Sequence, residues 1–221
     1  MNPDEEKLLI FLKRNFEKGF NKREIVLIMF DILRTHIMKK VQLSDEEFSL
    51  ATTFFIPKKV RKRQFLLQEG DDCKWLIFVS KGCLRCYSVD GKGEEHIVRF
   101  AVEGWWISDI QSFVTGKPAT NYIDAIEDSE LLMIEKTSYD KLCTVIPKLE
   151  HYFRILLENS NSAALMRISD LISASAEDRY LNFINTYPQI VQRVPQNQIA
   201  SYLGITPQSL SRIRKELSKK K

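Results

Sequence analysis

Long apolar segments and regular cysteine spacing are both missing from this 221-residue sequence. The apolar run from Ile25 to Phe30 is followed at once by Asp31, so it falls far short of the roughly 18 to 20 residues that a membrane span needs. It also lies too far inside the chain for a signal peptide. The four cysteines are unevenly spaced, which indicates reduced thiols rather than a disulfide framework. We therefore expect a cytoplasmic protein that does not enter a membrane.

The motifs of common enzyme and metal sites are missing as well. There is no glycine-rich phosphate loop, nucleophile elbow or paired-carboxylate arrangement, so the sequence indicates no enzyme. His36, His96 and His151 are isolated from one another, and we expect no metal and no cofactor. Cys83 and Cys86 lie in one expected strand at an odd separation, which points their side chains to opposite faces. We interpret them as packing residues and not as a metal or redox pair.

The composition that remains is that of an ordinary globular protein, with 44% hydrophobic and 28% charged residues. Its length predicts one or two domains. The net charge of +4 is unevenly placed, because seven basic residues and one acidic residue follow Gln189 and leave the rest of the chain slightly acidic. This asymmetry favours a polyanion-binding module at the C-terminal end, and a solvated basic tail is the alternative.

The N-terminal part, residues 1–43, is predicted to be helical. A helix start at Asn2, Pro3 and Asp4 precedes apolar residues at helical spacing, and a second helix is expected over residues 22–40. Ser44 followed by Glu47 is a capping-box signal for a third helix.

Residues 44–146 have a different pattern of short apolar and β-branched runs separated by turn signals. Asp90-Gly91 between two such runs predicts a β-hairpin. Many short strands at regular spacing predict a closed, jelly-roll-like β-roll or a sandwich. The expected strands are 64–68, 75–80, 83–89, 94–101, 122–125 and 130–134.

Helical spacing returns after residue 136. Thr137 and Asp140 resemble a capping start, and Pro147 opens a long helix that we expect to reach about Ala174. A narrow stripe at spacings of three and four follows this helix, which predicts that residues 147–174 are a dimerisation helix. The alternative is that the stripe packs on the chain's own β-domain. The stripe consists of Leu149, Phe153, Leu156, Ser160, Ala163, Arg167 and Leu171.

The last segment, residues 175–221, contains the most informative motif. Ala200 is small at the point where two helices would cross, and Gly204 provides a tight turn because it adopts positive φ without steric penalty. Thr206 is a predicted N-cap and Pro207 a first-turn residue of the next helix. The pattern predicts a helix-turn-helix whose second helix extends to Leu217.

The second helix of this motif has a polar outer face. Its apolar residues recur at spacings that bury them together, which leaves five polar side chains pointing outward. Arginine suits the guanine acceptors, glutamine suits adenine, and serine suits bases or phosphates. The outward residues are Gln208, Ser209, Ser211, Arg212 and Lys215. They predict binding to double-stranded DNA through the major groove, and a helical hairpin with a merely polar face is the alternative.

From about Leu33 to Leu217 the sequence resembles the Crp/Fnr regulators. Besides the helix-turn-helix, the resemblance lies in four segments of the β-region, at residues 65–71, 78–82, 104–110 and 123–129. It implies a cyclic-nucleotide-binding-type β-roll that senses an effector, a dimerisation helix and a DNA-binding domain. It also implies that Gln208, Ser211 and Arg212 contact bases and that Gln196 contacts phosphate. RNA polymerase would then be a candidate partner.

The sequence departs from this family in two places. Members that bind cyclic AMP use a glutamate for the ribose and an arginine with serine or threonine for the phosphate, where this chain has Asp109, Ala119 and Thr120. Without that arginine the charge-assisted bonds to phosphate are lost, so we expect an effector other than cyclic AMP. Arg85, Arg99 and Trp105 are further candidates for the pocket. The β-hairpin wing that commonly follows the recognition helix is not seen, and Lys219 to Lys221 are expected to contact phosphate instead.

The resulting prediction is an α+β protein with an N-terminal β-roll sensor domain, a long dimerisation helix and a C-terminal all-α helix-turn-helix domain. As a homodimer it would regulate transcription. The rival hypothesis is a ligand-binding β-barrel or an enzyme whose C-terminal helices mediate only protein contacts.

Overall fold

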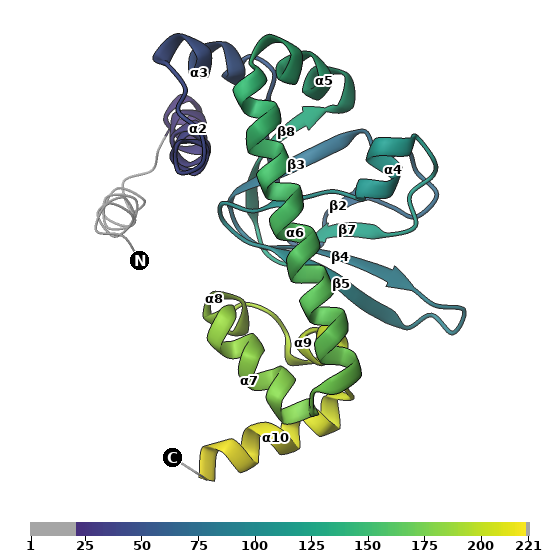
Figure 1. Cartoon of the computed structure of the whole chain (residues 1–221). Helices are drawn as coiled ribbons and strands as arrows, with labels where there is room; N and C mark the ends of the chain where they lie inside the picture. Colours follow the sequence, from purple (N-terminus) through teal and green to yellow (C-terminus); the bar gives the residue numbers. More distant parts are fainter. Residues whose placement is uncertain (1–20, 220–221) are drawn as a thin grey trace.

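The structure is a computed structural model that describes residues 21–219. The helix expected near Pro3 and the last two lysines lie outside the described residues. Two N-terminal helices and a β-roll form the upper part of the molecule, one long helix runs down its side, and a helical domain lies below (Figure 1). This arrangement confirms the predicted fold class.

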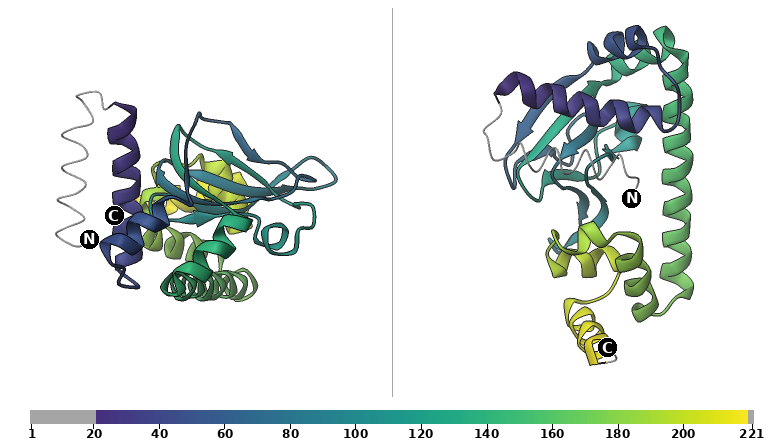
Figure 2. Two further views of the ribbon diagram at one scale, coloured as in Figure 1. Left: turned by 90° about the horizontal axis from the view of Figure 1, so that it is seen from above. Right: turned by 90° about the vertical axis from the view of Figure 1, so that its left-hand side faces the viewer.

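Helices α2 (Lys22–Met38) and α3 (Asp45–Thr52) precede the β-roll. Each begins with a capping box, formed by Asn21 with Glu24 and by Ser44 with Glu47, so the capping signal at Ser44 is confirmed. Apolar residues on one side of α2 are buried in the main core because this helix packs across β3 and β8. The helix crosses the outside of the β-roll, as Figure 2 shows.

Within the described part of the chain, eight antiparallel strands form two four-stranded sheets with orders β1-β8-β3-β6 and β2-β7-β4-β5. The main core joins apolar side chains of both sheets with those of α2, α3, α5 and the start of α6. The strands are β1 (Ile56–Val60), β2 (Phe65–Leu67), β3 (Trp75–Lys81), β4 (Leu84–Val89), β5 (Glu95–Ala101), β6 (Trp106–Ile107), β7 (Tyr122–Ala125) and β8 (Ser129–Glu135).

Six of these strands match the predicted runs, and the β4–β5 hairpin at Asp90-Gly91 is confirmed. The Asp90 carboxylate closes its turn by accepting hydrogen bonds from the backbone N–H groups of Lys92 and Glu94. The sequence analysis missed β1, β6 and the short helix α4 (Ile110–Thr115). All three are short, and β1 is largely exposed, so none carries a strong apolar pattern.

Helix α5 (Lys136–Val145) leads into α6 (Pro147–Ser173). The expected capping start at Thr137 and Asp140 is wrong, because α5 begins at Lys136 after Glu135 with no side-chain cap. The start of α6 is confirmed, with Pro147 in its first turn, where a missing N–H costs no hydrogen bond.

The stripe predicted to form a dimer seam on α6 faces its own chain instead. Leu149 and Phe153 are buried in the core of the β-roll, and Ser160 accepts a hydrogen bond from Arg99 of β5. Arg167 contacts carbonyl groups of β5. Spacing alone does not tell a helix face that packs on its own sheet from one that packs on a second copy. A different face of α6 carries exposed apolar side chains, at Leu157, Leu165, Ile168 and Ile172.

Four helices follow α6 in the described residues, α7 (Ala176–Thr186), α8 (Pro188–Val191), α9 (Gln196–Leu203) and α10 (Pro207–Lys219). They share a second apolar core with the outer face of the β4–β5 sheet. Phe183, Ile199 and Leu203 pack in one cluster with Tyr87 and Phe100 of the sheet. The helical domain is therefore docked against the β-roll as well as joined to it by α6.

A buried polar network connects α2, β6 and α6. The hydroxyl of Tyr152 accepts a hydrogen bond from the Trp106 indole at 2.9 Å and lies 2.7 Å from Nδ1 of His36. When His36 is neutral with Nδ1 unprotonated, the Tyr152 hydroxyl donates a hydrogen bond to Nδ1 while it accepts one from the Trp106 indole. Burial, with the nearby charges of Lys40 and Lys39, lowers the pKa of His36 from 6.5 to about 4.

We expect the stability of the protein to fall as the pH drops from 6.5 to 4. In this window the unfolded chain binds a proton at His36 while the folded chain does not, so acid favours unfolding by up to about 3 kcal/mol. Denaturant unfolding at several pH values measures this slope. It should flatten in His36→Phe and persist in His151→Gln, which alters an exposed histidine. An unchanged slope in His36→Phe would show that other groups cause it.

Candidate functional site

Helices α9 and α10 form the helix-turn-helix. Gly204 adopts φ +65° after the last residue of α9, and the N–H of Ile205 reaches the carbonyl of Ala200 at 3.0 Å. This is the left-handed helix end that the sequence predicted. The hydroxyl of Thr206 accepts a hydrogen bond from the Ser209 N–H at 3.2 Å, so Thr206 caps α10 as expected.

One side of α10 is exposed and polar. Leu210 and Ile213 are buried against α7 and α9, which fixes the rotation of the helix. The opposite side lies at the far end of the molecule from α5 (Figure 1). Its residues line one shallow, open surface: Pro207, Gln208, Ser211, Arg212 and Lys215. Four of the five predicted outward side chains are therefore brought together.

Ser209 and Gln196 are placed differently from these four. Ser209 is half-buried, and its hydroxyl accepts a hydrogen bond from Thr206 at 2.9 Å. Gln196, at the start of α9, is also half-buried, and its Oε1 is enclosed without a hydrogen-bond partner. Both residues lie in the first turn of a helix, Gln196 in α9 and Ser209 in α10.

Replacing Gly204 by alanine should destabilise the helix-turn-helix by about 1 kcal/mol or more, because L-residues avoid this positive φ. The added Cβ would also lie 2.9 Å from a methyl carbon of Leu171, which would have to move. Gly91→Ala is the matched control, since Gly91 has neither positive φ nor an atom within 4 Å of the new Cβ. Thermal unfolding compares the variants, and equal melting temperatures would contradict this assignment.

The first helix of the motif is hydrogen-bonded to the edge of the β-roll. Strand β5 is an edge strand, and the hydroxyl of Ser201 accepts from the Ile97 N–H at 2.9 Å and donates to the Glu95 carbonyl at 3.0 Å. Arg167 of α6 donates to the carbonyls of Ile97 and Val98. These contacts cover polar edge groups that would otherwise need water or a further strand.

A second polar contact holds the helical domain from the other side. Arg193 donates to both carboxylate oxygens of Glu103, at 2.7 and 3.0 Å, and pairs with Glu127. These carboxylates raise the pKa of Arg193 although its burial opposes this. Neither this group nor Ser201 was predicted from the sequence, because their partners are 66 to 106 positions away and no local pattern marks them.

Three of the residues suggested for an effector pocket, Arg85, Asp109 and Thr120, are held by polar groups of the chain itself. Arg85 is buried and donates to both oxygens of Asp124, at 2.8 and 2.9 Å, and it also pairs with Glu95. Asp109 accepts from the Thr120 N–H and from the Asn121 amide. The guanidinium of Arg85 is already paired with two carboxylates, so its charge is not available to a ligand phosphate.

The other three pocket candidates have different surroundings. Ala119 is buried and supplies no polar side chain. Arg99 donates to Ser160 of α6 at 3.0 Å, and the Trp105 ring packs edge-on against Tyr187 of the helical domain. Arg99 and Trp105 therefore contribute to the contacts between the β-roll, α6 and the helical domain.

The cysteines are free thiols in packed surroundings. Cys83 lies in the core shared with the helical domain, whereas Cys86 lies in the main core, so the two point to opposite faces of the sheet as predicted. Burial raises the pKa of each to about 12, which keeps both protonated at neutral pH.

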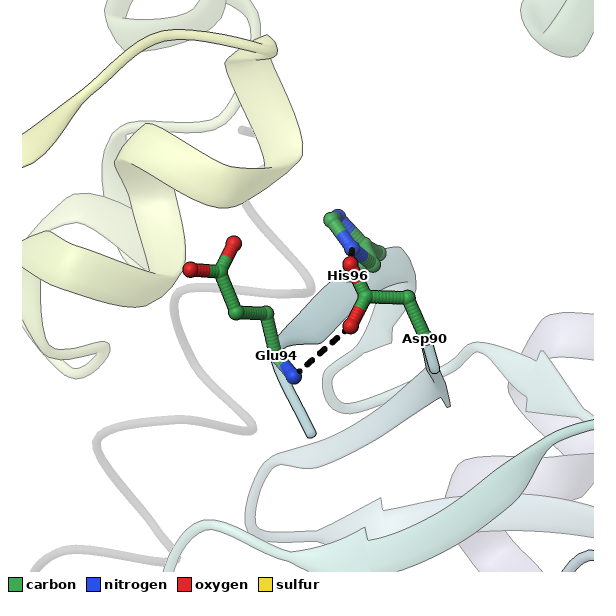
Figure 3. A group of neighbouring side chains, drawn as sticks. All are labelled: Asp90, Glu94 and His96. Atoms are coloured by element: carbon green, nitrogen blue, oxygen red, sulfur yellow. Dashed lines mark hydrogen bonds and ion pairs between the residues drawn. The ribbon is translucent and has the colours of Figure 1, made fainter. Parts of the chain in front are cut away.

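Asp90, Glu94 and His96 at the β4–β5 hairpin each offer one ligand atom, and these atoms lie within 4.8 Å of one another. The turn brings them together across the hairpin, which residue spacing alone did not reveal (Figure 3). All three are exposed, and Nε2 of His96 already contacts the Asp90 carboxylate at 3.0 Å. Contacts with His96 and with the turn N–H groups lower the pKa of Asp90 to about 2.

Within residues 21–219, no helix is both long enough and apolar enough to cross a membrane.

Comparison with known proteins shows similarity to regulatory proteins in sequence and to a solved structure in fold. Residues 57–145 match the cyclic nucleotide-binding domain family. The chain is 25% identical to the regulatory protein HlyX of Actinobacillus pleuropneumoniae over 185 residues, which are 77% of this chain and 75% of that protein. It is 27% identical to the fumarate and nitrate reduction regulatory protein of Vibrio cholerae over 169 residues, 71% of this chain and 66% of that protein. The fold is similar to FixK2 from Bradyrhizobium japonicum, with a TM-score of 0.65, 17% identity and coverage of 75% and 85% of the two chains.

Proposed function

This chain is related to the Crp/Fnr regulators in sequence and fold, and from that premise we propose that it is a cytoplasmic, dimeric regulator that binds specific double-stranded DNA sequences. The observation that carries the proposal is the exposed polar side of α10. Gln208, Ser211, Arg212 and Lys215 share this side, and no acidic residue lies in the first turn. Such a helix fits the major groove, whose width admits one α-helix.

Each side chain on this surface suits a different part of DNA. Arg212 can donate two hydrogen bonds to guanine, and Gln208 can pair with adenine in the same bidentate way. Lys215 and the exposed Lys219 suit phosphates, which fix the register of the helix on the duplex. Gln196 and Thr206 lie at the helix starts, where backbone N–H groups attract phosphate. Ser209 would act by holding Thr206 in place.

The dimer would form along the exposed apolar stripe of α6. Leu157, Leu165, Ile168 and Ile172 follow one another at spacings that keep them on one side of the helix, and Ile172 is 82% exposed. An apolar stripe of this kind on a helix is typical of a contact between two copies. We propose the divisions 1–43, 44–146, 147–174 and 175–221 for the lead-in, β-roll, dimer helix and DNA-binding domain. RNA polymerase is the partner that such a regulator would contact.

We expect cyclic AMP to bind with a dissociation constant no better than about 1 mM. The buried Ala119 provides no charge for the phosphate, and Arg85 is held by Asp124 and Glu95. Isothermal titration calorimetry measures the affinity. A dissociation constant in the low micromolar range, about −8 kcal/mol, would show that another basic residue takes the phosphate.

The salt dependence of DNA binding tests the proposed function. The full chain should bind a random-sequence duplex with an affinity that falls steeply as salt rises, because phosphate contacts release counterions. A β-barrel protein or an enzyme whose C-terminal helices contact only proteins would bind duplex weakly at every salt concentration. That flat result would overturn the proposal.

A further inference from the structure

A cleft of about 410 Å³ lies where α6 meets the helical domain. Its walls come from α6, α7 and α9, which meet in the lower half of the molecule in Figure 1. The volume lies within the range of small-molecule sites. Polar residues of the wall include Arg167, Asp170, Arg179, Asn182 and Asn185, and aromatic and aliphatic residues form the rest.

Arg167 is a largely buried cation in this cleft without an anionic partner. Its guanidinium donates to three backbone carbonyls, of Ile97, Val98 and Tyr202, and stacks over the Tyr202 ring at 4.0 Å. Its Nε is enclosed without a hydrogen-bond acceptor, and no carboxylate among residues 21–219 forms an ion pair with it. Burial lowers the pKa of Arg167, which is the sign of a charge that lacks compensation.

Arg179 adds a second cation to the same wall. Its Nε donates to the Leu203 carbonyl at 3.0 Å and Nη1 to the Ala174 carbonyl at 2.7 Å, while Nη2 donates to no group among residues 21–219. Asp170 is the acidic residue of the wall, so the two arginines leave the cleft with a formal charge of +1. Asn182 and Asn185 are exposed amides that can donate further hydrogen bonds.

We propose that this cleft binds a small organic anion with an aromatic or apolar body, and that this anion is the effector of the regulator. The anionic head would pair with Arg167 and Arg179, and the body would lie against Met166, Phe183 and Tyr187. The regulatory part of this inference rests on the proposed DNA-binding function, whereas the binding site itself does not.

The position of the cleft explains how such a ligand would act. Arg167 connects α6 to β5 and to the end of α9, and Arg179 connects α7 to the same helix end. An anion held by both arginines would therefore contact α6 and α7 at once, and both arginines are hydrogen-bonded to the end of α9, the first helix of the helix-turn-helix. A ligand shifts an equilibrium by its difference in affinity for the two states, so binding here would favour the docked position of α9.

Aromatic anions of simple structure test the site in the full-length protein. Benzoate and phenyl phosphate are the probes, benzamide is the neutral counterpart, and inorganic phosphate is the anion without an apolar body. Calorimetry gives the affinities, and the NMR signals of the arginine Nε–H groups locate the site. We expect one or both aromatic anions to bind at least about tenfold more tightly than benzamide, as one charge-assisted hydrogen bond would give. They should also bind more tightly than phosphate and shift the Arg167 and Arg179 signals.

Two substitutions that change the charge of the cleft in opposite directions test the anion site. Arg179→Gln should weaken binding about tenfold, whereas Asp170→Asn should strengthen it about threefold to fivefold by removing a like charge. Arg61→Gln and Asp31→Asn make the same charge changes outside the cleft and should have no effect. Because Asp170→Asn leaves both arginines in place, it remains informative if Arg179→Gln fails to fold.

The possible outcomes separate this inference from the proposed function. Equal affinity for benzoate and benzamide, binding with unshifted arginine signals, or weaker binding in Asp170→Asn would overturn the anion site. If the site binds the probe while DNA affinity stays the same with and without it, the effector role is wrong. If DNA does not bind at all, the proposed function fails while the calorimetric result for the cleft still stands.

Discussion

Replacing Ile168 by glutamate is expected to turn the dimer into monomers and to weaken operator binding by about 100-fold or more. Ile168 lies in the middle of the exposed apolar stripe of α6 and is 53% exposed in the single chain. In a symmetric dimer the same stripe of both copies meets, so the substitution would place two like charges in an apolar contact. A dimer binds two half-sites of the operator at once and therefore binds more tightly than a monomer, which binds only one.

Light scattering and DNA titration measure the two effects of Ile168→Glu separately. Met166→Glu is the matched control, because Met166 is also exposed on α6 but two residues earlier, where the helix turns it to the other side. We expect Met166→Glu to remain dimeric. If Ile168→Glu also stays a dimer at micromolar concentration, this stripe of α6 is not the interface.

Replacing Arg212 by alanine should cost about 1 to 3 kcal/mol on the best operator, which is about fivefold to 150-fold in affinity. Arg212 lies on the open side of α10, and Leu210 and Ile213 fix the rotation that points it outward. Without this contact, the protein should discriminate less between bases at one position of each half-site. Its affinity for non-specific DNA should change much less.

Titrations of operator and scrambled duplexes distinguish base reading from phosphate contact. Arg214→Ala removes the same charge from the same helix, but Arg214 does not line the open surface, so its effect should be equal on both duplexes. An equal loss on both duplexes for Arg212→Ala would mean that α10 lies differently on DNA.

The helix-turn-helix could be predicted in detail because its signals are local. Gly204, Thr206 and Pro207 each determine the backbone within a few residues of their own position, and the structure shows the turn, cap and helix start there. The β4–β5 hairpin was predictable for the same reason, since its turn is formed by Asp90 and the residues just after it, with Gly93 at φ +83°. Local chemistry of this kind needs no knowledge of the rest of the fold.

Contacts between distant segments were not predictable in this way. The stripe with Leu149 and Phe153 has the same spacing whether it packs on its own β-roll or on a second copy, and it packs on the β-roll. The contacts of Arg167 and Arg193 depend on how α6 and the helical domain dock against the β-roll. The spacing of residues along one helix gives no information on that docking. The placement of Trp105 against Tyr187 depends on the same docking.

Selection of bound duplexes from a random-sequence pool tests the central claim, that two copies of α10 read DNA, most directly. We expect the full-length protein to enrich a two-fold symmetric sequence whose half-site centres lie about 10 base pairs, or one helical turn, apart. Enrichment of no sequence, or of one with no two-fold symmetry, would contradict the claim.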